Sequence, residues 1–291
     1  MSKTLAFSAI ILLYLQSLAY SAPRYRIFHK KTISKSVVIF ESKLADVGKG
    51  KVVGLDNYYN NEWKKDKNGN SVPFHYLWED QAESGFSDLK GIINKLGAET
   101  ATLKNAPTLM DLNRFSIYFI IDPDTPRETE KPNYIEADAV KQIVDWVKKG
   151  GVLVLFGNDS INAEFEHWNQ LAKNFGIRFE QNCVNKVIGT NWDMGKFDIF
   201  PDHPIFKNIR KIYLKEISTL KLESPAIPVL TRDNKVIMAS AKVGKGFVFA
   251  LGDPWLYNEY IGHSRLPETF QDYEAATNLF SWLLGIAKPV K

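Results

Sequence analysis

Hydrophobic residues in this chain form a few short, uninterrupted runs that predict strands buried on both faces. The clearest run, Val152–Phe156, is preceded by two glycines and followed by Gly157-Asn158-Asp159. An apolar run without alternation is typical of a central strand in a parallel sheet. Ile117–Ile121 has the same character. We therefore expect a parallel sheet with Val152–Phe156 near its centre.

Amphipathic helices are expected on both sides of this central strand. Apolar residues at helical spacing predict one helix over residues 135–149 and another over about 162–175. Further strands are expected at residues 51–56 and 98–103, and a closing helix at about 270–284. This alternation is typical of an α/β fold with a doubly wound, mainly parallel sheet.

The pattern changes after Gly176, where short β-like segments follow one another without helices. Turn residues near Asn234 and at 244–246 predict hairpins, so we expect extra antiparallel strands in the C-terminal half. No linker divides this part from the rest, and residues 22–291 are expected to form a single domain. The segments expected to be strands are 177–180, 187–189, 212–222, 227–230, 236–241 and 247–251, with one more short strand near the N-terminus at 37–40.

The N-terminus has the three zones of a secretory signal peptide. Lys3 is followed by an almost wholly apolar stretch, residues 5–18, and then by small residues up to Ser21. We expect residues 1–21 to direct export, most simply to the periplasm, with secretion or surface attachment as alternatives. The apolar stretch is short for a membrane span, so no stable membrane insertion is expected.

The composition is that of an ordinary globular protein, with 45% hydrophobic and 24% charged residues. The formal net charge is +4, and no run of lysine or arginine exceeds two residues beyond the leader. Nucleic acid is therefore not an expected partner, whereas a mildly basic surface suits an acidic substrate. Cys183 is the only cysteine, so no internal disulfide can form.

Polar residues follow four of the expected strands at the point where each strand ends. A single aspartate there often caps a helix or forms a turn, but carboxyl ends of parallel strands meet at one edge, so we expect a shared polar cleft. Oxygen ligands of this kind suit calcium or magnesium, although calcium-loop spacing is absent. No metal site or cofactor is predicted, and a divalent cation stays an open alternative. The residues are Asp56 with Asn57, Asp122 with Asp124, Asn158 with Asp159, and Asp253.

Two histidines lie near carboxylates. His75 and Glu79 belong to a long aromatic segment, where histidine suits proton transfer and Glu79 could orient it; the alternative is a histidine packed among aromatic rings. Glu164 and His167 are three residues apart on an expected helix, so they can share a metal or a proton. For this second pair a solvated ion pair is the favoured interpretation.

Aromatic residues gather in the same loops. Tyr58, Trp78 and Tyr257 stand beside Asn, Asp and Glu residues rather than on helical stripes. Rings of this kind offer apolar faces to sugar C–H groups while the neighbouring polar atoms bind hydroxyls, which indicates a carbohydrate cleft. Core packing is the alternative for several of them.

Taken with the doubly wound order, several segments resemble the glutamine-amidotransferase-like domain found beside, or fused to, unsaturated glycuronyl hydrolases in polysaccharide-degrading bacteria. True amidotransferases of this fold place a catalytic cysteine on a sharp turn between strand and helix. The corresponding turn here is Gly157-Asn158-Asp159, and a Gly-x-Ser-x-Gly elbow is missing too, so nucleophilic catalysis is not expected. The matching segments are Asp56-Asn57-Tyr58-Tyr59-Asn60, His75-Tyr76-Leu77-Trp78-Glu79-Asp80, Asp122-Pro123-Asp124-Thr125, Pro132-Asn133-Tyr134-Ile135, residues 151–159, Lys215-Glu216-Ile217-Ser218 and residues 252–259.

The resemblance implies a lyase, an oligosaccharide dehydratase of the ulvan type. Such enzymes remove water from a non-reducing-end uronic acid, leaving an unsaturated uronic acid for glycuronyl hydrolases, and they act alongside lyases and sulfatases. The reaction needs a base, a group that neutralises the carboxylate, and an acid for the departing hydroxyl. The candidates are His75 or Tyr58 for the base, Lys215 or Asn158 for the carboxylate, and Glu79 or Asp159 for the acid.

The substrate-binding residues expected in this cleft come from all of these segments. Two other interpretations stay open. A non-catalytic carbohydrate-binding or accessory domain needs the aromatic cleft without the ionisable groups, and a structural partner of a hydrolase would expose a large apolar patch. The ionisable groups at one sheet edge favour an enzyme. The expected binding residues are Asp56, Asn57, Trp78, Asp122, Asp124, Asn158, His167, Lys215, Asp253, Tyr257 and Asn258.

Overall fold

The structure, a computed structural model, describes residues 46–200 and 202–290. The expected leader at residues 1–21 and the short strand expected at 37–40 lie outside the described residues. In chain order the elements are β1 (Val52–Asp56), β2 (Trp63–Lys65), β3 (Ser71–Pro73), α2 (Ser87–Lys95), β4 (Glu99–Leu103), α3 (Leu109–Leu112), β5 (Ile117–Ile121), α4 (Ala137–Lys149), β6 (Val152–Phe156), α5 (Phe165–Ala172), the short 3-10 helix η1 (Lys173–Phe175), β7 (Ile177–Phe179), η2 (Trp192–Gly195), β8 (Lys196–Asp198), β9 (Lys211–Tyr213), β10 (Leu220–Leu222), β11 (Ala226–Arg232), β12 (Lys235–Val243), β13 (Gly246–Leu251), α6 (Asn258–Ile261) and α7 (Asp272–Ile286).

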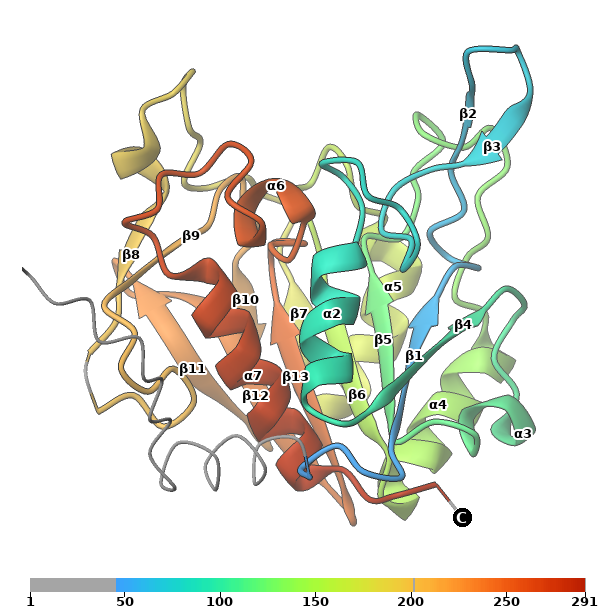
Figure 1. The fold of residues 1–291 in the computed structure, drawn as a ribbon. Coiled ribbons are helices and arrows are strands. Elements are labelled where there is room, and N and C mark those ends of the chain that lie inside the picture. The colour runs from blue at the N-terminus through green and yellow to red at the C-terminus, as the bar shows by residue number, and fades with distance from the viewer. Residues whose placement is uncertain (1–45, 201, 291) are drawn as a thin grey trace, which may run out of the picture.

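One large sheet organises the chain (Figure 1). Its strand order is β4-β1-β5-β6-β13-β12-β10-β7, and β11 also pairs with β12. The strands β4, β1, β5, β6 and β13 run parallel, whereas β12 is antiparallel to β13, β10 and β11, and β7 is antiparallel to β10. The predicted α/β fold is confirmed, with antiparallel strands in the C-terminal half and β6 between two parallel neighbours.

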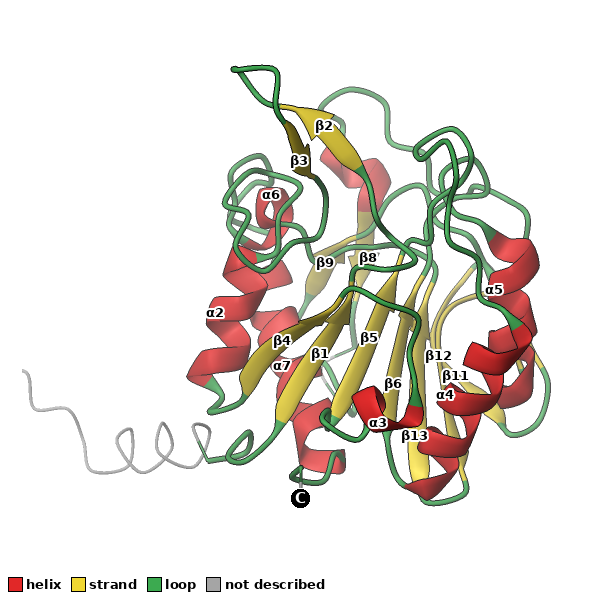
Figure 2. Ribbon diagram, turned by 90° about the vertical axis from the view of Figure 1, so that its right-hand side faces the viewer, coloured by secondary structure: helices red, strands yellow, loops and turns green. Residues whose placement is uncertain are grey.

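Alternate residues of the central strands face two separate helix layers. In β5, Phe119 packs in the core beneath α2 and α7, while Tyr118 and Ile120 pack beneath α4 and α5. Every residue of β5 and β6 is buried, which explains why neither strand alternates in hydrophobicity. Figure 2 shows the sheet edge-on between these layers.

Two expectations for the C-terminal half are wrong in detail. The segment expected as a strand at 187–189 is a loop, and the one expected at 212–222 is split into β9 and β10. Between these two strands the backbone of Glu216 has a φ of +50°, which an extended strand cannot accommodate. β9 pairs with β8 in a separate two-stranded sheet, and the chain joins the large sheet only at β10, so Lys215 and Glu216 lie in the connection between the two sheets.

The long segment between β1 and α2 is ordered around a small hairpin. Strands β2 and β3 pair antiparallel through Trp63 and Pro73, and a turn at Asn68-Gly69 lies at the tip. This hairpin projects beyond the carboxyl edge of the parallel strands, as Figures 1 and 2 both show.

Asp272 at the start of α7 makes stability depend on pH. This fully buried carboxyl accepts hydrogen bonds from Trp255 Nε1 at 2.7 Å and from the Tyr213 N–H at 3.1 Å. Burial raises its pKa from 3.8 to about 8. The folded state therefore binds this proton more tightly than the unfolded chain, and the resulting stabilisation is lost as pH rises through about 8.

We expect the free energy of unfolding to decline with pH less steeply in Asp272→Asn than in the wild type, because the amide carries no titrating proton. Between about pH 5 and pH 8 the difference should be ~3–4 kcal/mol, at about 1.4 kcal/mol for each pH unit. Urea unfolding at both pH values measures the change. Asp138→Asn, an exposed carboxyl in the first turn of α4, is the matched control. Equal slopes in the wild type and Asp272→Asn would contradict the assignment.

Candidate functional site

Four parallel strands bring their polar residues to one edge of the sheet, as the sequence predicts. β1 ends at Asp56 and Asp122 directly follows β5, while Asn158 and Asp253 come shortly after β6 and β13. These strand ends lie together at the top of the sheet in Figure 1. Ligands of open α/β sheets bind at this carboxyl edge.

A cavity of about 260 Å³ opens at this edge. That volume lies just below the ~300–1,000 Å³ of most small-molecule sites, and it suits a ligand of about one sugar ring. Six of the predicted site residues line the cavity: His75, Asp122, Asn158, Lys215, Asp253 and Tyr257. The other lining residues are Tyr76, Glu128, Asn162, Glu216, Pro254 and Glu259.

Asp122 is the most constrained residue of the cavity. Its Oδ2 accepts hydrogen bonds from the Tyr76 hydroxyl at 2.5 Å and from Asn158 Nδ2 at 3.0 Å. Its Oδ1 is buried and has no partner among the described residues. Burial, and repulsion by Glu128, raise the pKa of this carboxyl well above its ordinary value. With a φ of +42°, Asp122 is held in a strained conformation of the kind that clusters at functional sites.

Tyr76 and Tyr257 extend the hydrogen-bonded chain that ends at Asp122. Their hydroxyl oxygens are 2.8 Å apart and their ring centroids 5.2 Å apart. Burial, followed by the nearby Asp122 charge, raises the pKa of both phenols well above the ordinary value. Both tyrosines therefore stay protonated near neutral pH, and a hydroxyl proton can pass along this chain.

His75 is paired with a carboxylate that sets its tautomer. Its Nδ1 lies 2.6 Å from Glu62 Oε1, with the His75 side chain 28% exposed and that of Glu62 10% exposed. A carboxylate at Nδ1 accepts the Nδ1–H, so the neutral ring carries its lone pair on Nε2. Nε2 forms no hydrogen bond with any residue that the structure describes. This geometry leaves Nε2 free to accept a proton.

Lys215 gives the cavity a cation. Its Nζ lies 3.6 Å from Glu216 Oε2, and both side chains are about one-third exposed. The backbone N–H of Lys215 donates to Asp253 Oδ2 at 2.8 Å, and Asp253 Oδ1 accepts from the Trp255 N–H at 2.7 Å. Burial raises the pKa of Asp253 to about 7. Asp253 therefore anchors the loop that holds Lys215 beside the cavity.

Glu128 adds another carboxyl that resists ionisation. It accepts hydrogen bonds from the backbone N–H and the hydroxyl of Thr125, both at 2.9 Å, and burial raises its pKa to about 7. Within residues 46–200 and 202–290, no three His, Cys, Asp or Glu side chains are grouped so that they could hold a metal ion.

Five predicted site residues lie near the carboxyl edge but do not line the cavity. Asp56 and Asp159 accept hydrogen bonds from backbone N–H groups in the turns that follow their own strands, whereas Asp124 accepts from the Asn61 N–H in the segment after β1. The asparagine donates to the carbonyl of the preceding residue, and the tyrosine packs edge-on against the next ring. Their contacts shape the strand ends rather than the cavity. These residues are Asp56, Asn57, Tyr58, Asp124 and Asp159.

Four other predicted site residues lie elsewhere. The Glu79 side chain is 75% exposed and pairs with Lys90, so the structure does not place it beside His75. Trp78 is buried in the core, and Asn258 holds loop carbonyls through its side chain. His167 lies 3.2 Å from Glu164, in the ion pair that the helical spacing favours, and stacks on a tyrosine ring outside the cavity.

Sequence reasoning missed Glu62 and Glu128 as site residues and did not see Tyr76 as a partner of Asp122. Glu62 is 13 residues before His75, and the β2–β3 hairpin brings the two together. Tyr76 and Asp122 are separated by 46 residues. The one sequence feature that points to Tyr76 as a site residue is its position next to His75 in the aromatic segment.

A second hollow adjoins the cavity. It has a volume of about 470 Å³ and shares His75, Tyr257 and Glu259 with the cavity, while Phe74 and Glu83 are among its other lining residues. Arg265 contacts both Glu83 and Glu259, the latter at 3.4 Å. The two hollows are therefore neighbours that meet at the side chains they share.

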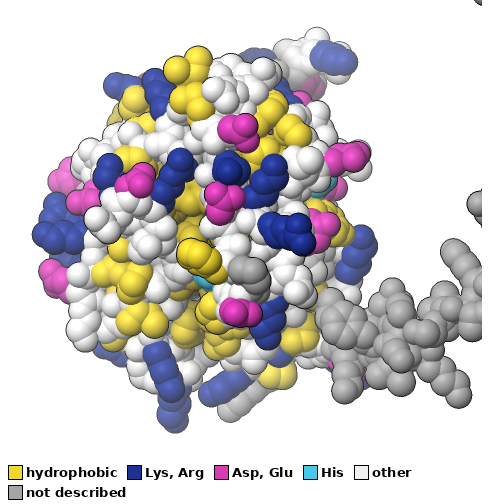
Figure 3. All heavy atoms as spheres, turned by 90° about the vertical axis from the view of Figure 1, so that its left-hand side faces the viewer, with side chains coloured by type: hydrophobic (Ala, Val, Ile, Leu, Met, Phe, Trp, Pro, Cys, Tyr) yellow, Lys and Arg dark blue, Asp and Glu magenta, His cyan; other side chains and the backbone are white. Residues whose placement is uncertain are grey.

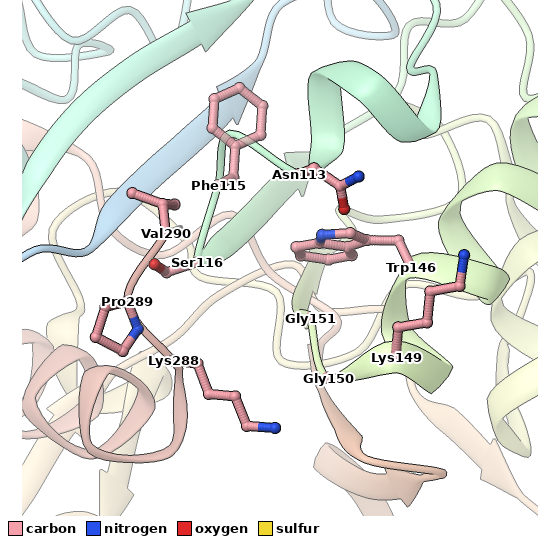
Figure 4. A pocket seen from close by; sticks show the side chains of 10 residues that line it. All are labelled: Asn113, Phe115, Ser116, Trp146, Lys149, Gly150, Gly151, Lys288, Pro289 and Val290. Carbon is pink, nitrogen blue, oxygen red and sulfur yellow. The ribbon is translucent and has the colours of Figure 1, made fainter.

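Another hollow, of about 450 Å³, lies at the opposite, amino edge of the parallel strands. Figure 4 shows its lining, which includes Trp146, Lys149 and Lys288. Its side chains supply two amines but no carboxyl or imidazole. Acid–base chemistry is therefore supported at the carboxyl edge and not here.

Charges of both signs are mixed on the face seen in Figure 3, which covers the C-terminal half of the sheet. Among the residues that the structure describes, the lysines and arginines on this face form no extended basic stripe of the kind that follows a nucleic-acid backbone (Figure 3). No helix in the described part of the chain is long and apolar enough to cross a membrane.

Comparison with known proteins supports the fold. The sequence matches no protein-family model and no curated protein. Among solved structures, the N-terminal domain of mmIFT52 is similar with a TM-score of 0.58 and 13% identity, over 80% of this chain and 96% of that one. Two cytoplasmic proteins from Salmonella typhimurium each have a TM-score of 0.54, at 17% and 15% identity, over 82% of this chain and 99% and 100% of theirs. At these identities the likeness shows a shared α/β fold alone.

Proposed function

We propose that this protein is a lyase that removes water from the terminal uronic acid of an acidic oligosaccharide. One observation carries the proposal: a single cavity at the carboxyl edge is lined by His75 with a bare Nε2, by the chain Tyr257–Tyr76–Asp122, and by Lys215. These are the base, the acid and the cation that such an elimination needs. The resemblance to the glutamine-amidotransferase-like domain points the same way.

Lys215 is the residue we assign to the substrate carboxylate. The proton on the carbon beside a carboxylate is weakly acidic because its removal builds negative charge on that group. An ammonium ion paired with the carboxylate stabilises this charge as it develops. Asn158 also lines the cavity, but its Nδ2 donates to Asp122, so Lys215 is the stronger of the two predicted candidates.

His75 takes the proton in this scheme. Nε2 removes the proton from the carbon that bears the carboxylate, and Glu62 stabilises the imidazolium that forms. Tyr58, the other predicted base, does not line the cavity.

Tyr257 supplies the proton to the leaving group. As the carbon–oxygen bond at the adjacent ring carbon breaks, its electron pair goes to the departing hydroxyl, which takes the phenolic proton and leaves as water. The electrons of the broken C–H bond form the ring double bond. Tyr76 and Asp122 can pass a proton to Tyr257. This role replaces Glu79 and Asp159, neither of which lines the cavity.

The test is incubation of the mature protein with saturated oligosaccharides that end in glucuronate, iduronate or galacturonate. The new double bond is conjugated with the carboxylate, so we expect ultraviolet absorbance to rise with time on at least one substrate. Parallel reactions with a chelator determine whether a divalent cation is needed.

A non-catalytic carbohydrate-binding domain is the second candidate, and the adjoining hollow beside Phe74 and Tyr257 favours it. It predicts measurable binding of the same oligosaccharides with no rise in absorbance on any of them. That result would contradict the proposed lyase activity but would support an oligosaccharide as the ligand.

A further inference from the structure

The β2–β3 hairpin carries an aromatic and basic face that the proposed chemistry does not use. Resting on the proposed function, we infer that this face binds the sugar units that follow the terminal one in an acidic oligosaccharide. Trp63 would stack on a sugar ring, and Lys65 would pair with a carboxylate or sulfate group. The geometry and the charge of the hairpin support this assignment.

Strand register places these two residues on one side of the hairpin. Trp63 pairs with Pro73 and Lys65 with Ser71, and side chains two apart in a strand share a face. The hydrogen bond from Lys65 Nζ to Ser71 Oγ, at 2.9 Å, fits this arrangement. Lys64 belongs to the other face, where its Nζ lies 3.9 Å from the centroid of the Phe74 ring.

The face is preorganised although it is open to solvent. Trp63 is 57% exposed, yet its Nε1 donates to Asn61 Oδ1 at 3.0 Å, which orients the indole. At the tip, Asp66 accepts hydrogen bonds from the N–H groups of Asn68 and Asn70, both at 2.8 Å. Because these residues are already ordered, the protein loses little further conformational entropy when a ligand binds to this face.

An acidic saccharide is the occupant that charge and position favour. The exposed hairpin holds Lys64, Lys65 and Lys67 against one carboxylate, Asp66. Trp63 directly follows Glu62, the partner of His75, but their side chains alternate to opposite faces of the hairpin. The hairpin projects beyond the carboxyl edge at which the cavity opens (Figure 1), so a chain whose terminal unit occupies the cavity would pass over the hairpin edge to reach this face. An indole face suits sugar C–H groups, and an ammonium ion retains free N–H donors beyond its bond to Ser71.

Affinity for oligoglucuronides of different length tests this assignment. Isothermal titration of the mature protein with a dimer and with a hexamer is compared for the wild type, Trp63→Ala and Lys65→Ala. We expect each substitution to weaken hexamer binding roughly tenfold, the scale of one aromatic or ionic contact, while dimer binding changes less than about twofold.

Met110→Ala and Lys148→Ala are the matched controls, because both residues are exposed and lie on α3 and α4, whose positions are away from the hairpin. Equal losses for dimer and hexamer, unchanged hexamer binding in both hairpin variants, or no hexamer binding by the wild type would overturn the inference. So would Trp63-dependent binding to vesicles of acidic phospholipid with none to the hexamer. Length-dependent binding without turnover supports the hairpin site and refutes only the lyase.

Discussion

Replacing His75 with alanine is expected to lower kcat for the elimination about 100- to 10,000-fold, the range that a positioned general base contributes. The variant keeps Lys215 and Tyr257, which also line the cavity, so KM should change much less than kcat. Steady-state absorbance kinetics measure both constants. The side chain of His75 is partly exposed and lies in a loop, so the substitution should leave the fold intact.

His167→Ala is the control for this experiment because His167 forms a second histidine–glutamate pair, outside the cavity. It should retain near-wild-type kcat. The kcat of Glu62→Gln should lie between those of His75→Ala and His167→Ala, because a neutral amide does not stabilise the imidazolium as the carboxylate does. The assignment of the base fails if His75→Ala retains its rate, or if His167→Ala loses as much as His75→Ala does.

Tyr257→Phe is expected to lower kcat about 100-fold or more, since the leaving hydroxyl then lacks its proton donor. The ring remains to fill the same space, and only the hydroxyl that lies 2.8 Å from that of Tyr76 is removed. Single-turnover kinetics separate this loss from slower product release. Tyr76→Phe should also lower the rate because it disconnects Tyr257 from Asp122.

Tyr273→Phe is the control for the loss of a tyrosine hydroxyl outside the cavity. Tyr273 lies on α7, where its hydroxyl accepts a hydrogen bond from Lys95. It should leave turnover unchanged. If Tyr257→Phe turned over at the wild-type rate, another residue would have to protonate the leaving group, and Glu128, whose pKa burial raises to about 7, would be the next candidate in the cavity.

The parallel half of the fold could be predicted because its strands are apolar on every residue. Val152–Phe156 and Ile117–Ile121 are buried completely and sit side by side in parallel register. Such runs have few other stable environments in a globular protein. The C-terminal half was harder to predict because β7, β8, β9 and β10 have only three residues each. In addition, the break between β9 and β10 depends on a positive φ at Glu216, a conformation that glutamate seldom adopts.

The location of the site was also accessible from the sequence, because carboxyl ends of parallel strands meet at one edge. That rule found Asp122, Asn158 and Asp253. It could not separate them from Asp56 and Asp159, whose carboxylates are used by the turns that follow. Position at a strand end fixes the edge, whereas the direction of each side chain depends on tertiary contacts.

The aromatic segment shows why individual roles were not predictable. His75 and Tyr76 both adopt positive φ, 58° and 50°, so the chain turns sharply there. Three residues later Glu79 points to solvent and pairs with Lys90, while His75 instead meets Glu62 from the hairpin. Their place in one aromatic segment suggested that His75 and Glu79 form a pair, whereas the fold pairs His75 with Glu62.

The measurement that tests the central claim most directly uses a uronic-acid-ended oligosaccharide with deuterium on the ring carbon that bears the carboxylate. Mass spectrometry then follows the product formed by the wild-type protein. The proposed elimination predicts a product lighter by one water that has lost the deuterium, since His75 removes it as the double bond forms. An unchanged oligosaccharide, or a cleaved product that retains the deuterium, would contradict the account.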